Sequence, residues 1–308
     1  MPEGSRRVAV IDIGSNSTRL LVADVEDGRV TPIERRSTVT RLGRGVDLSG
    51  RLAAEAIEAT CGAIDPYVAT LQELGAERVD AIATSAVRDA DNGGAFVAEL
   101  RERFALSARV LDGEEEARLT YLGATSETAP EVPTLVIDIG GGSTEMIVGQ
   151  GRQIDFHTSL QAGVVRHTER HLTSDPPTPV ELEELAADLR ALIEAATLQA
   201  PRAEAGIAVA GTPTSLAAVE LGLEPYDPSR VHGHVLELRS IQRMLSRLAS
   251  TPLSQRMQIR GLHADRAPTI VAGVVTLVEA MRAFDLDRIT VSEHDILYGA
   301  AIALRESI

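Results

Sequence analysis

Lysine is absent from this 308-residue chain, and all thirty of its basic residues are arginine. This absence excludes a phosphate-binding loop of the Walker A type, Schiff-base chemistry and the lysine of protein kinases, since each requires that residue. Arginine can still hold phosphate oxygens through two parallel N–H groups. The chain is therefore suited to bind phosphate by other means than a lysine loop.

Cysteine is nearly absent, and Cys61 has no partner for a disulfide or a C-x-x-C pair. A buried structural role in a reducing compartment is expected for it. No apolar run approaches the roughly 20 residues that span a bilayer. The net charge of −15 argues against a nucleic-acid partner, which needs a basic surface. The composition favours a cytoplasmic protein of two domains without membrane contact.

A nine-residue motif occurs twice in the chain. Residues 10–18 (VIDIGSNST) match residues 136–144 (VIDIGGGST) at seven of nine positions. Each copy is an apolar strand, an aspartate and a Gly/Ser/Asn turn that allows close backbone approach to a ligand. The turn amides can bind phosphate oxygens while Asp12 and Asp138 approach a divalent cation. The repeat predicts two related domains that clamp a phosphate-bearing anion.

Mixed strands and helices follow each copy of the motif. Apolar periodicity predicts helices over 53–74, 94–104, 180–199 and 295–304, strands over 79–84 and 207–210, and a loop over 85–88. The second domain's long helix is expected to begin behind Asp175-Pro176-Pro177 and to bury its leucine stripe. We predict a first domain of residues 1–128, a second of 129–294, and a final helix, 295–308, that packs back on the first domain.

Several further segments give the chain a family resemblance. It resembles the exopolyphosphatase and guanosine pentaphosphate phosphohydrolase family of the actin-like superfamily over nearly its whole length. The segments that carry the resemblance are 12–17 (DIGSNS), 41–45 (RLGRG), 83–88 (ATSAVR), 113–118 (GEEEAR), the second turn through Glu145, and 210–212 (AGT). The resemblance implies an α/β protein of two ribonuclease H-like domains. Each is expected to be a mixed five-stranded sheet flanked by helices, with the active site in the interdomain cleft.

The resemblance also implies hydrolysis by water that a glutamate activates. Glu116 best matches the catalytic position, and Glu115 is the close alternative. The expected metal ligands are Asp12, Asp138 and Glu145, for Mg²⁺ or Mn²⁺, with a monovalent cation also allowed. The expected phosphate contacts are Gly14, Ser15, Asn16, Ser17, Arg88, Gly140, Gly141, Gly142, Ser143, Thr144, Arg44 and Arg266. Arg19 is a weaker candidate because its side chain can equally point away from the site.

The resemblance implies an exopolyphosphatase that releases terminal orthophosphate, with a homodimer as the expected assembly. Long members of the family carry a further C-terminal region, so we expect this chain to prefer short polyphosphate. Three alternatives remain open: a guanosine pentaphosphate 5′-phosphohydrolase, a nucleoside triphosphatase or kinase that uses residues 210–215 against adenosine, and a non-catalytic alarmone sensor.

Two features lie outside this pattern. His167 and His171 have the i, i+4 spacing of a helical metal pair, but without an H-E-x-x-H sequence between them, surface histidines are the favoured interpretation. Residues 297–299 (LYG) stand where the family leads us to expect an arginine-glutamate-glycine sequence. A function that depends on the arginine of that sequence is therefore not expected in this chain.

Overall fold

The computed structural model describes residues 6–306. Within this range the chain forms two compact units, one of residues up to 128 together with those from 294 onward, and one of residues 129–293. None of the described helices has both the length and the apolar character needed to cross a membrane. Each unit is built on one mixed β-sheet.

The sheet of the first unit has five strands in the order β3-β2-β1-β4-β5. Strands β1 (Arg6–Ile13), β2 (Ser17–Glu26) and β3 (Arg29–Val39) are antiparallel neighbours. Strands β4 (Arg78–Ala83) and β5 (Ala108–Val110) continue from β1 in parallel. This strand order and direction is the ribonuclease H-like arrangement that the sequence predicts.

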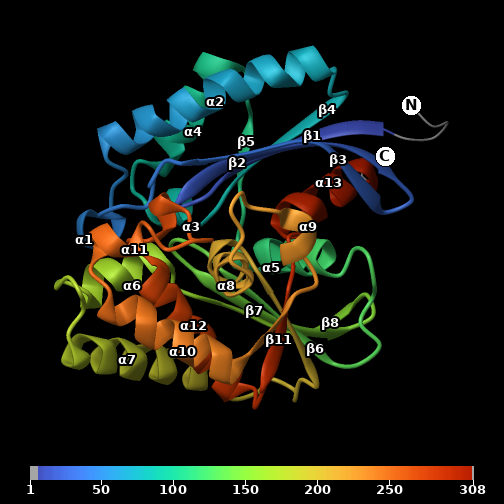
Figure 1. Cartoon of the computed structure of the whole chain (residues 1–308). Coiled ribbons are helices and arrows are strands. Elements are labelled where there is room, and N and C mark those ends of the chain that lie inside the picture. The colour runs from blue at the N-terminus through green and yellow to red at the C-terminus, as the bar shows by residue number, and fades with distance from the viewer. Residues whose placement is uncertain (1–5, 307–308) are drawn as a thin grey trace. The chain divides into compact units, whose positions relative to one another are not determined.

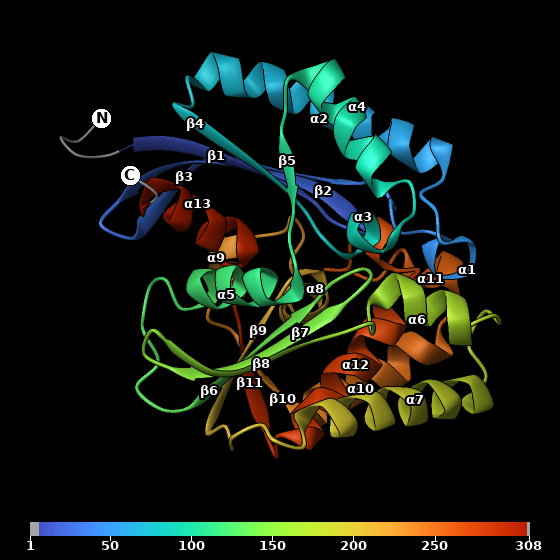
Figure 2. The same ribbon diagram turned by 180° about the vertical axis from the view of Figure 1, so that it is seen from behind.

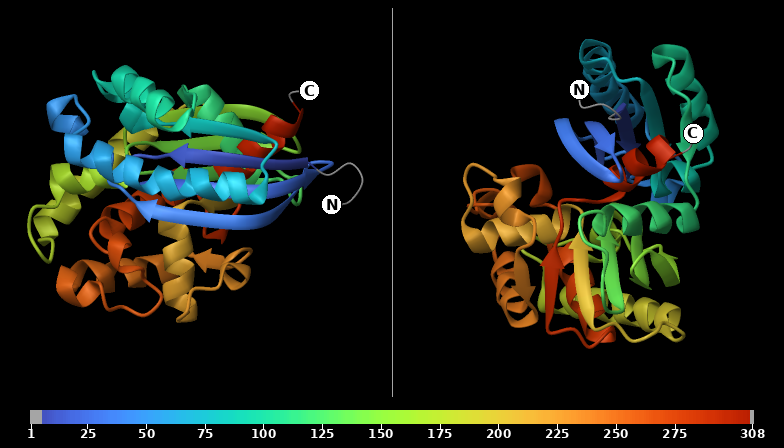
Figure 3. Two further views of the ribbon diagram at one scale, coloured as in Figure 1. Left: turned by 90° about the horizontal axis from the view of Figure 1, so that it is seen from above. Right: turned by 90° about the vertical axis from the view of Figure 1, so that its right-hand side faces the viewer.

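Two pairs of helices cover the two faces of this sheet. Helices α2 (Ala54–Leu74) and α4 (Gly93–Phe104) cover one face, whereas α5 (Gly113–Ala124) and α13 (Ile296–Glu306) lie against the other (Figure 1). In the view from above, α2 runs along the strands (Figure 3). Alternate residues of β1 divide between the two faces: Ile11 packs with α2, and Val10 packs with α13. Asp12 therefore belongs to the α5/α13 face.

The final helix is held against α5 by two glycines. A Cβ atom on Gly123 would lie 1.8 Å from the Asp295 carbonyl oxygen, and one on Gly299 would lie 1.8 Å from that of Leu119. Only hydrogen atoms fit at this approach. Leu297 and Tyr298, where the family leads us to expect charged residues, are both buried in the same apolar cluster. The divergent sequence therefore has a packing role.

The sheet of the second unit has six strands in the order β10-β11-β9-β6-β7-β8. Its strands are β6 (Thr134–Ile139), β7 (Thr144–Gln150), β8 (Gln153–Leu160), β9 (Ala205–Val209), β10 (Val235–Glu237) and β11 (Arg288–Val291). Five of them repeat the order and direction of the first sheet. The prediction of five strands was wrong here because the three-residue strand β10 adds itself antiparallel to β11.

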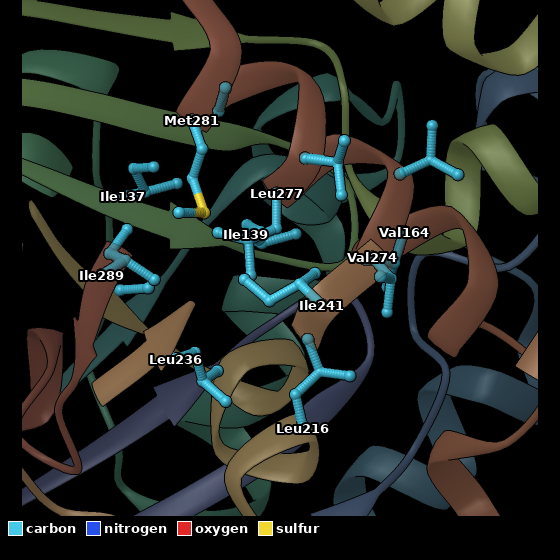
Figure 4. Packing of buried hydrophobic residues seen from close by; sticks show 14 of the residues in the cluster. Ile137, Ile139, Val164, Leu216, Leu236, Ile241, Val274, Leu277, Met281 and Ile289 are labelled. Atoms are coloured by element: carbon cyan, nitrogen blue, oxygen red, sulfur yellow. The ribbon is translucent and has the colours of Figure 1, made fainter. Parts of the chain in front are cut away.

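The core of the second unit lies between its sheet and a layer of helices. Helices α6 (Val164–His171), α7 (Pro179–Thr197), α10 (Leu238–Ser250) and α12 (Ile270–Ala283) lie on one side of the strands (Figure 2). Ile137 and Ile139 of β6 meet Leu277 and Met281 of α12 in this core (Figure 4). Asp138, which lies between those two isoleucines, points to the opposite face of the sheet.

The long helices and strands expected from periodicity are present with small shifts at their ends. Residues 85–88 are not a loop as predicted, because Ser85–Asp89 forms the short helix α3. Helix α7 begins at Pro179, one residue before its predicted start, and the hydroxyl of its cap residue Thr178 forms a capping box with Glu181. The remaining helices are α1 (Val46–Ser49), α8 (Gly211–Leu221), α9 (Pro228–Val231), α11 (Leu253–Arg256) and a 3₁₀ turn at Ala264–Arg266.

Candidate active site

The turn between β1 and β2 has its carbonyl groups engaged within the fold. The Gly14 N–H donates to the Ser17 carbonyl at 3.1 Å. The Ser15 carbonyl accepts from the Gly43 N–H at 2.7 Å, and the Asn16 carbonyl accepts from the two amides that follow β3, at 3.1 and 2.9 Å. A Cβ atom on Gly43 would lie 2.8 Å from that of Ser15. The segment after β3 therefore holds this turn from behind.

The same turn leaves donors without acceptors. Among the described residues, the backbone N–H groups of Ser15 and Asn16 have no hydrogen-bond acceptor. The side-chain nitrogen of Asn16 is buried and also unpartnered. Neighbouring backbone amides that lack internal acceptors form a site for an anion. The hydroxyl of Ser15 pairs with that of Ser85 at 2.9 Å, which ties the turn to α3.

The turn between β6 and β7 repeats this arrangement. The Gly140 N–H donates to the Ser143 carbonyl at 3.0 Å. The carbonyls of Gly140, Gly141 and Gly142 accept from the amides of residues 164, 165 and 163, at 2.9, 2.9 and 3.1 Å. Here the start of α6 takes the place of the segment after β3. The sequence repeat is therefore also a repeat of hydrogen bonds.

This second turn also presents free amides. Within residues 6–306, no acceptor faces the N–H groups of Gly141, Gly142 and Ser143. A Cβ atom on Gly163 would lie 2.3 Å from the backbone of the turn, so only glycine allows α6 to approach this closely. The Thr144 hydroxyl donates to the Ala162 carbonyl at 2.7 Å. Its proton is used inside the fold, and so it is not offered to an anion.

The aspartates of the two turns differ in their cross-strand neighbours. Asp12 lies opposite Arg19, and Asp138 lies opposite Glu145. Residues directly opposite on antiparallel strands share a face and contact each other. The first unit therefore balances its aspartate with an arginine, whereas the second places two buried carboxylates side by side. Two adjacent carboxylates offer the oxygen ligands that a divalent cation prefers.

Asp12 is buried among charged groups of its own unit. Its Oδ2 accepts from Arg19 Nε at 2.8 Å and Nη2 at 2.6 Å, and Arg19 also pairs with Asp295. Burial raises the pKa of Asp12, the charge of Arg19 opposes that rise, and the charge of Asp295 adds to it. The other carboxylate oxygen, Oδ1, is buried and has no hydrogen-bond partner among the described residues. A Mg²⁺ ion prefers an oxygen ligand of this kind, so Asp12 fits the predicted metal role.

The glutamates at the start of α5 point in different directions. Asp112 caps the helix by accepting from the Glu115 N–H at 2.8 Å. Glu115 Oε1 then pairs with Arg109 at 2.6 Å in a partly exposed position. Consecutive helical residues are about 100° apart around the axis, so Glu116 turns inward, where it is only 6% exposed. The predicted alternatives Glu115 and Glu116 therefore have different surroundings.

Glu116 is held by Arg88 from α3. Arg88 Nη1 donates to Glu116 Oε2 at 2.9 Å and to the Leu111 carbonyl at 2.7 Å. Burial raises the pKa of Glu116 to about 7, against the opposing effect of Arg88 and with the charge of Asp12 adding to the rise. A buried carboxylate with a pKa near neutrality is suited to accept a proton from water.

The other predicted arginines have different surroundings. Arg44 is exposed, and its side chain forms no ion pair within the described part of the chain, although its neighbour Gly43 holds the first turn. Arg266 packs its guanidinium against Gly211 at the start of α8, where Ala210 has a φ of 73° that normally favours glycine. Arg19, the weaker candidate, points toward Asp12.

Some residues near these groups were missed from the sequence. Asp295 reaches Arg19 from the far end of the chain, so no local pattern connects the two. Arg166 donates to the Gly142 carbonyl at 3.1 Å, yet it lies in a helix with no motif. Ser85 supports Ser15 and lies inside the segment 83–88 that the resemblance marks, which was the one available signal.

Comparison with known proteins agrees with this architecture. A family model described as the Ppx/GppA phosphatase family matches residues 21–302. The chain is 37% identical to Exopolyphosphatase 2 of Mycobacterium tuberculosis, over 97% of this chain and 98% of that protein. It is 26% identical to a guanosine-5′-triphosphate,3′-diphosphate pyrophosphatase of Vibrio cholerae, over 92% of this chain and 56% of that protein.

Solved structures show the same similarity. A crystal structure of an exopolyphosphatase-like protein has a TM-score of 0.92 and 33% identity, covering 97% of this chain and 98% of that one. The Aquifex aeolicus member of the Ppx/GppA family has a TM-score of 0.84 and 33% identity, with 99% of each chain covered.

Proposed function

Because this chain belongs to the Ppx/GppA phosphatase family and is a phosphoanhydride hydrolase, we propose that it releases terminal orthophosphate from inorganic polyphosphate. The observation that carries the proposal is the environment of Glu116. A buried carboxylate with a pKa of about 7 is held by Arg88, and its unit also contains a turn with unpartnered amides. This combination suits water activation next to a phosphate.

In the proposed reaction, Glu116 accepts a proton from a water molecule. The water oxygen forms a bond to the terminal phosphorus, and the bridging P–O bond breaks, so that the shortened polyphosphate leaves with the electron pair of that bond. The free amides of the turns stabilise charge on the phosphoryl oxygens. Glu116 then returns its proton to solvent, which restores the base.

We propose that the carboxylates that hold Mg²⁺ are Asp12 in the first unit and the Asp138–Glu145 pair in the second. The unpartnered Oδ1 of Asp12 and the adjacent carboxylates of the pair support this assignment. When bound, Mg²⁺ supplies positive charge that neutralises phosphate oxygens. Glu145 Oε1 accepts from the Ser159 hydroxyl at 2.8 Å, which fixes the orientation of that carboxylate.

Polyphosphate is preferred to guanosine pentaphosphate as the proposed substrate because of the relatives. The match covers 98% of the exopolyphosphatase relative but only 56% of the pyrophosphatase relative. Four statements stay predictions: a cytoplasmic location, a homodimer, a preference for short polyphosphate chains, and the equivalence of the two compact units with the predicted domains.

The test is phosphate release with Mg²⁺ from short polyphosphate, guanosine pentaphosphate and ATP, supplied separately at equal concentration of terminal phosphate. We expect the highest kcat/KM with polyphosphate. A higher kcat/KM with guanosine pentaphosphate would replace the proposed substrate by the alternative. Release from none of the three would remove the support for hydrolysis and favour a sensor.

Two variants test the proposed base. Glu116→Gln removes the proton acceptor but keeps the size of the side chain, so the rate should fall by about 10²–10⁴-fold. Glu115→Gln is the matched control, one position away in an exposed ion pair, and should retain most of the activity. The assignment is wrong if Glu115→Gln is the inactive variant and Glu116→Gln is active.

A further inference from the structure

The two histidines of α6 form a cluster with an aspartate of α7. His171 Nε2 lies 2.8 Å from Asp188 Oδ2, and His167 Nε2 lies 3.5 Å from the same oxygen. One ligand atom from each of the three residues lies within 4.8 Å of the others. Helices α6 and α7 are consecutive in the chain and lie close together in the second unit (Figure 2). The cluster therefore joins two neighbouring helices.

His167 is not the surface histidine that its sequence context favours. Its side chain is 0% exposed, and neither ring nitrogen has a hydrogen-bond partner within the described residues. A buried nitrogen without a partner loses its hydrogen bonds to water and gains none in return, so such a group calls for an explanation.

We propose that His167, His171 and Asp188 form a binding site for a divalent transition metal ion, with Zn²⁺ as the ion that fits best. Two imidazole nitrogens and one carboxylate oxygen are ligands that zinc commonly takes, at about 2.0–2.2 Å. Ligand atoms around a tetrahedral ion of that size are roughly 3.3 Å apart. The two histidine-to-aspartate distances, 2.8 and 3.5 Å, are close to that separation.

The site can be reached by solvent and differs in chemistry from the Mg²⁺ carboxylates. The side chains of His171 and Asp188 are 14% and 33% exposed, so an ion can enter on their side while His167 forms the buried wall. Mg²⁺ prefers oxygen ligands and binds imidazole poorly. The cluster is therefore expected to discriminate between Zn²⁺ and Mg²⁺.

The alternative is that Asp188 only accepts a hydrogen bond from His171, with Arg170 Nη1 3.8 Å away. That arrangement satisfies Asp188 and His171 but leaves both nitrogens of His167 without a partner. Metal binding replaces the His171 proton and gives His167 Nε2 a ligand bond. The metal site therefore gives His167 Nε2 a partner, which the hydrogen-bonded arrangement does not.

The position of the site gives it a structural consequence. The first residues of α6 donate the hydrogen bonds that hold the carbonyls of Gly140 and Gly141, and His167 and His171 lie further along the same helix. An ion that joins α6 to α7 fixes the helix that supports the second turn. The site would act as a structural brace of the second unit.

The test is a Zn²⁺ titration of the full-length, chelator-treated protein against a chromophoric competitor, with Mg²⁺ in excess. We expect one Zn²⁺ per chain and a rise in the thermal unfolding midpoint. Replacement of Zn²⁺ by Co²⁺ should give the visible absorption of a four-coordinate site. Binding of no ion, or loss of Zn²⁺ to the excess Mg²⁺, would overturn the proposal.

Substitutions locate the ion. His171→Ala and Asp188→Ala change partly exposed residues and should fold, and each should weaken Zn²⁺ binding by at least about tenfold. His167→Gln removes the buried ligand and should do the same. His157→Ala, on an exposed position of β8, is the matched control and should leave binding unchanged. Equal Zn²⁺ affinity in wild type, His171→Ala and Asp188→Ala would show that the ion binds elsewhere.

Discussion

Arg88 and Glu116 form a partly buried contact in which one guanidinium nitrogen, Nη1, donates to two acceptors. It lies 2.9 Å from Glu116 Oε2 and 2.7 Å from the Leu111 carbonyl oxygen. The second contact fixes Arg88 to the chain just before α5, so the arginine cannot easily follow a departing substrate. We infer that Arg88 acts on the rate through the charge of Glu116 more than through a phosphate contact of its own.

The rate of the proposed reaction should depend on pH through Glu116. A general base works only when it is ionised, and burial raises the pKa of Glu116 to about 7. We therefore expect kcat/KM to rise about tenfold per pH unit on the acid side and to level off above about pH 7. A kcat/KM that is already constant between pH 5 and 8 would rule out this carboxylate as the base.

Arg88→Gln should move that profile to higher pH. The positive charge of Arg88 opposes the rise in the pKa of Glu116, so its removal raises the pKa further. The midpoint of the kcat/KM profile is the measurement. Arg109→Gln is the control, because Arg109 pairs with Glu115 and Asp80 on an exposed part of the unit and should leave the midpoint in place. A lower kcat/KM without a shifted midpoint would instead point to direct binding of phosphate by Arg88.

The free energy of unfolding should fall with rising pH because of Glu116. The folded state holds the Glu116 proton up to about pH 7, whereas an unfolded glutamate releases its proton near the ordinary pKa of 4.5. The contribution of Glu116 to the free energy of unfolding is therefore complete below about pH 4.5 and is lost as the pH rises through 7. The free energy of unfolding changes by at most about 1.4 kcal/mol per pH unit from this cause.

Urea unfolding of wild type and Glu116→Gln between pH 4.5 and 8 measures this contribution. The glutamine of the variant cannot ionise. The free energy of unfolding of wild type minus that of the variant should therefore fall as the pH rises from 4.5 to about 7. A difference that stays constant over that range would mean that Glu116 titrates alike in both states.

The close approach of α6 to the second turn makes Gly163 sensitive to substitution. Gly163→Ala would place a Cβ atom 2.3 Å from the backbone of Gly141 and Gly142. We expect a loss of about 1–3 kcal/mol in unfolding free energy and a higher KM, because the displaced turn no longer presents its amides. Gly43→Ala should also lower the unfolding free energy and raise KM through the first turn, but by less, since the added Cβ would lie 2.8 Å from its nearest atom, the Ser15 Cβ.

Gly94→Ala is the control for both glycine variants. Gly94 lies in α4, and a Cβ atom there would meet nothing within 4 Å. Alanine should therefore stabilise the helix by about 0.5–1 kcal/mol without changing KM. If Gly163→Ala behaves like Gly94→Ala, the turn can adapt and the close packing is not required for binding.

The sequence predicts those parts of the molecule that depend on local patterns. The strand-aspartate-turn repeat is visible because strand alternation, glycine content and a polar turn all occur within nine residues. Strand β10 has only three residues and depends on its neighbour β11, so no local signal marks it. Asp295 contributes through a contact with Arg19, 276 positions away, which periodicity cannot reveal.

The burial of His167 was mispredicted for a related reason. Histidine is commonly at least partly exposed, so its identity alone favours the surface. Its environment is set by how α6 packs against α7 and α12, which depends on long-range contacts. By contrast, the different burial of Glu115 and Glu116 follows from the rotation between consecutive helical residues, once the Asp112 cap has fixed the start of α5.

Asp12→Asn should weaken the Mg²⁺ dependence of the proposed reaction. The substitution removes the negative charge and replaces one of two oxygens, while Arg19 keeps its contact with Asp295. We expect the Mg²⁺ concentration for half-maximal rate to increase by about 10–100-fold, since a ligand carboxylate is lost. Asp24→Asn is the matched control, because Asp24 pairs with Arg7 across the same two strands and carries no predicted metal role. If both variants need the same Mg²⁺ as wild type, the free Oδ1 of Asp12 is not a metal ligand, and the Asp138–Glu145 pair becomes the remaining candidate.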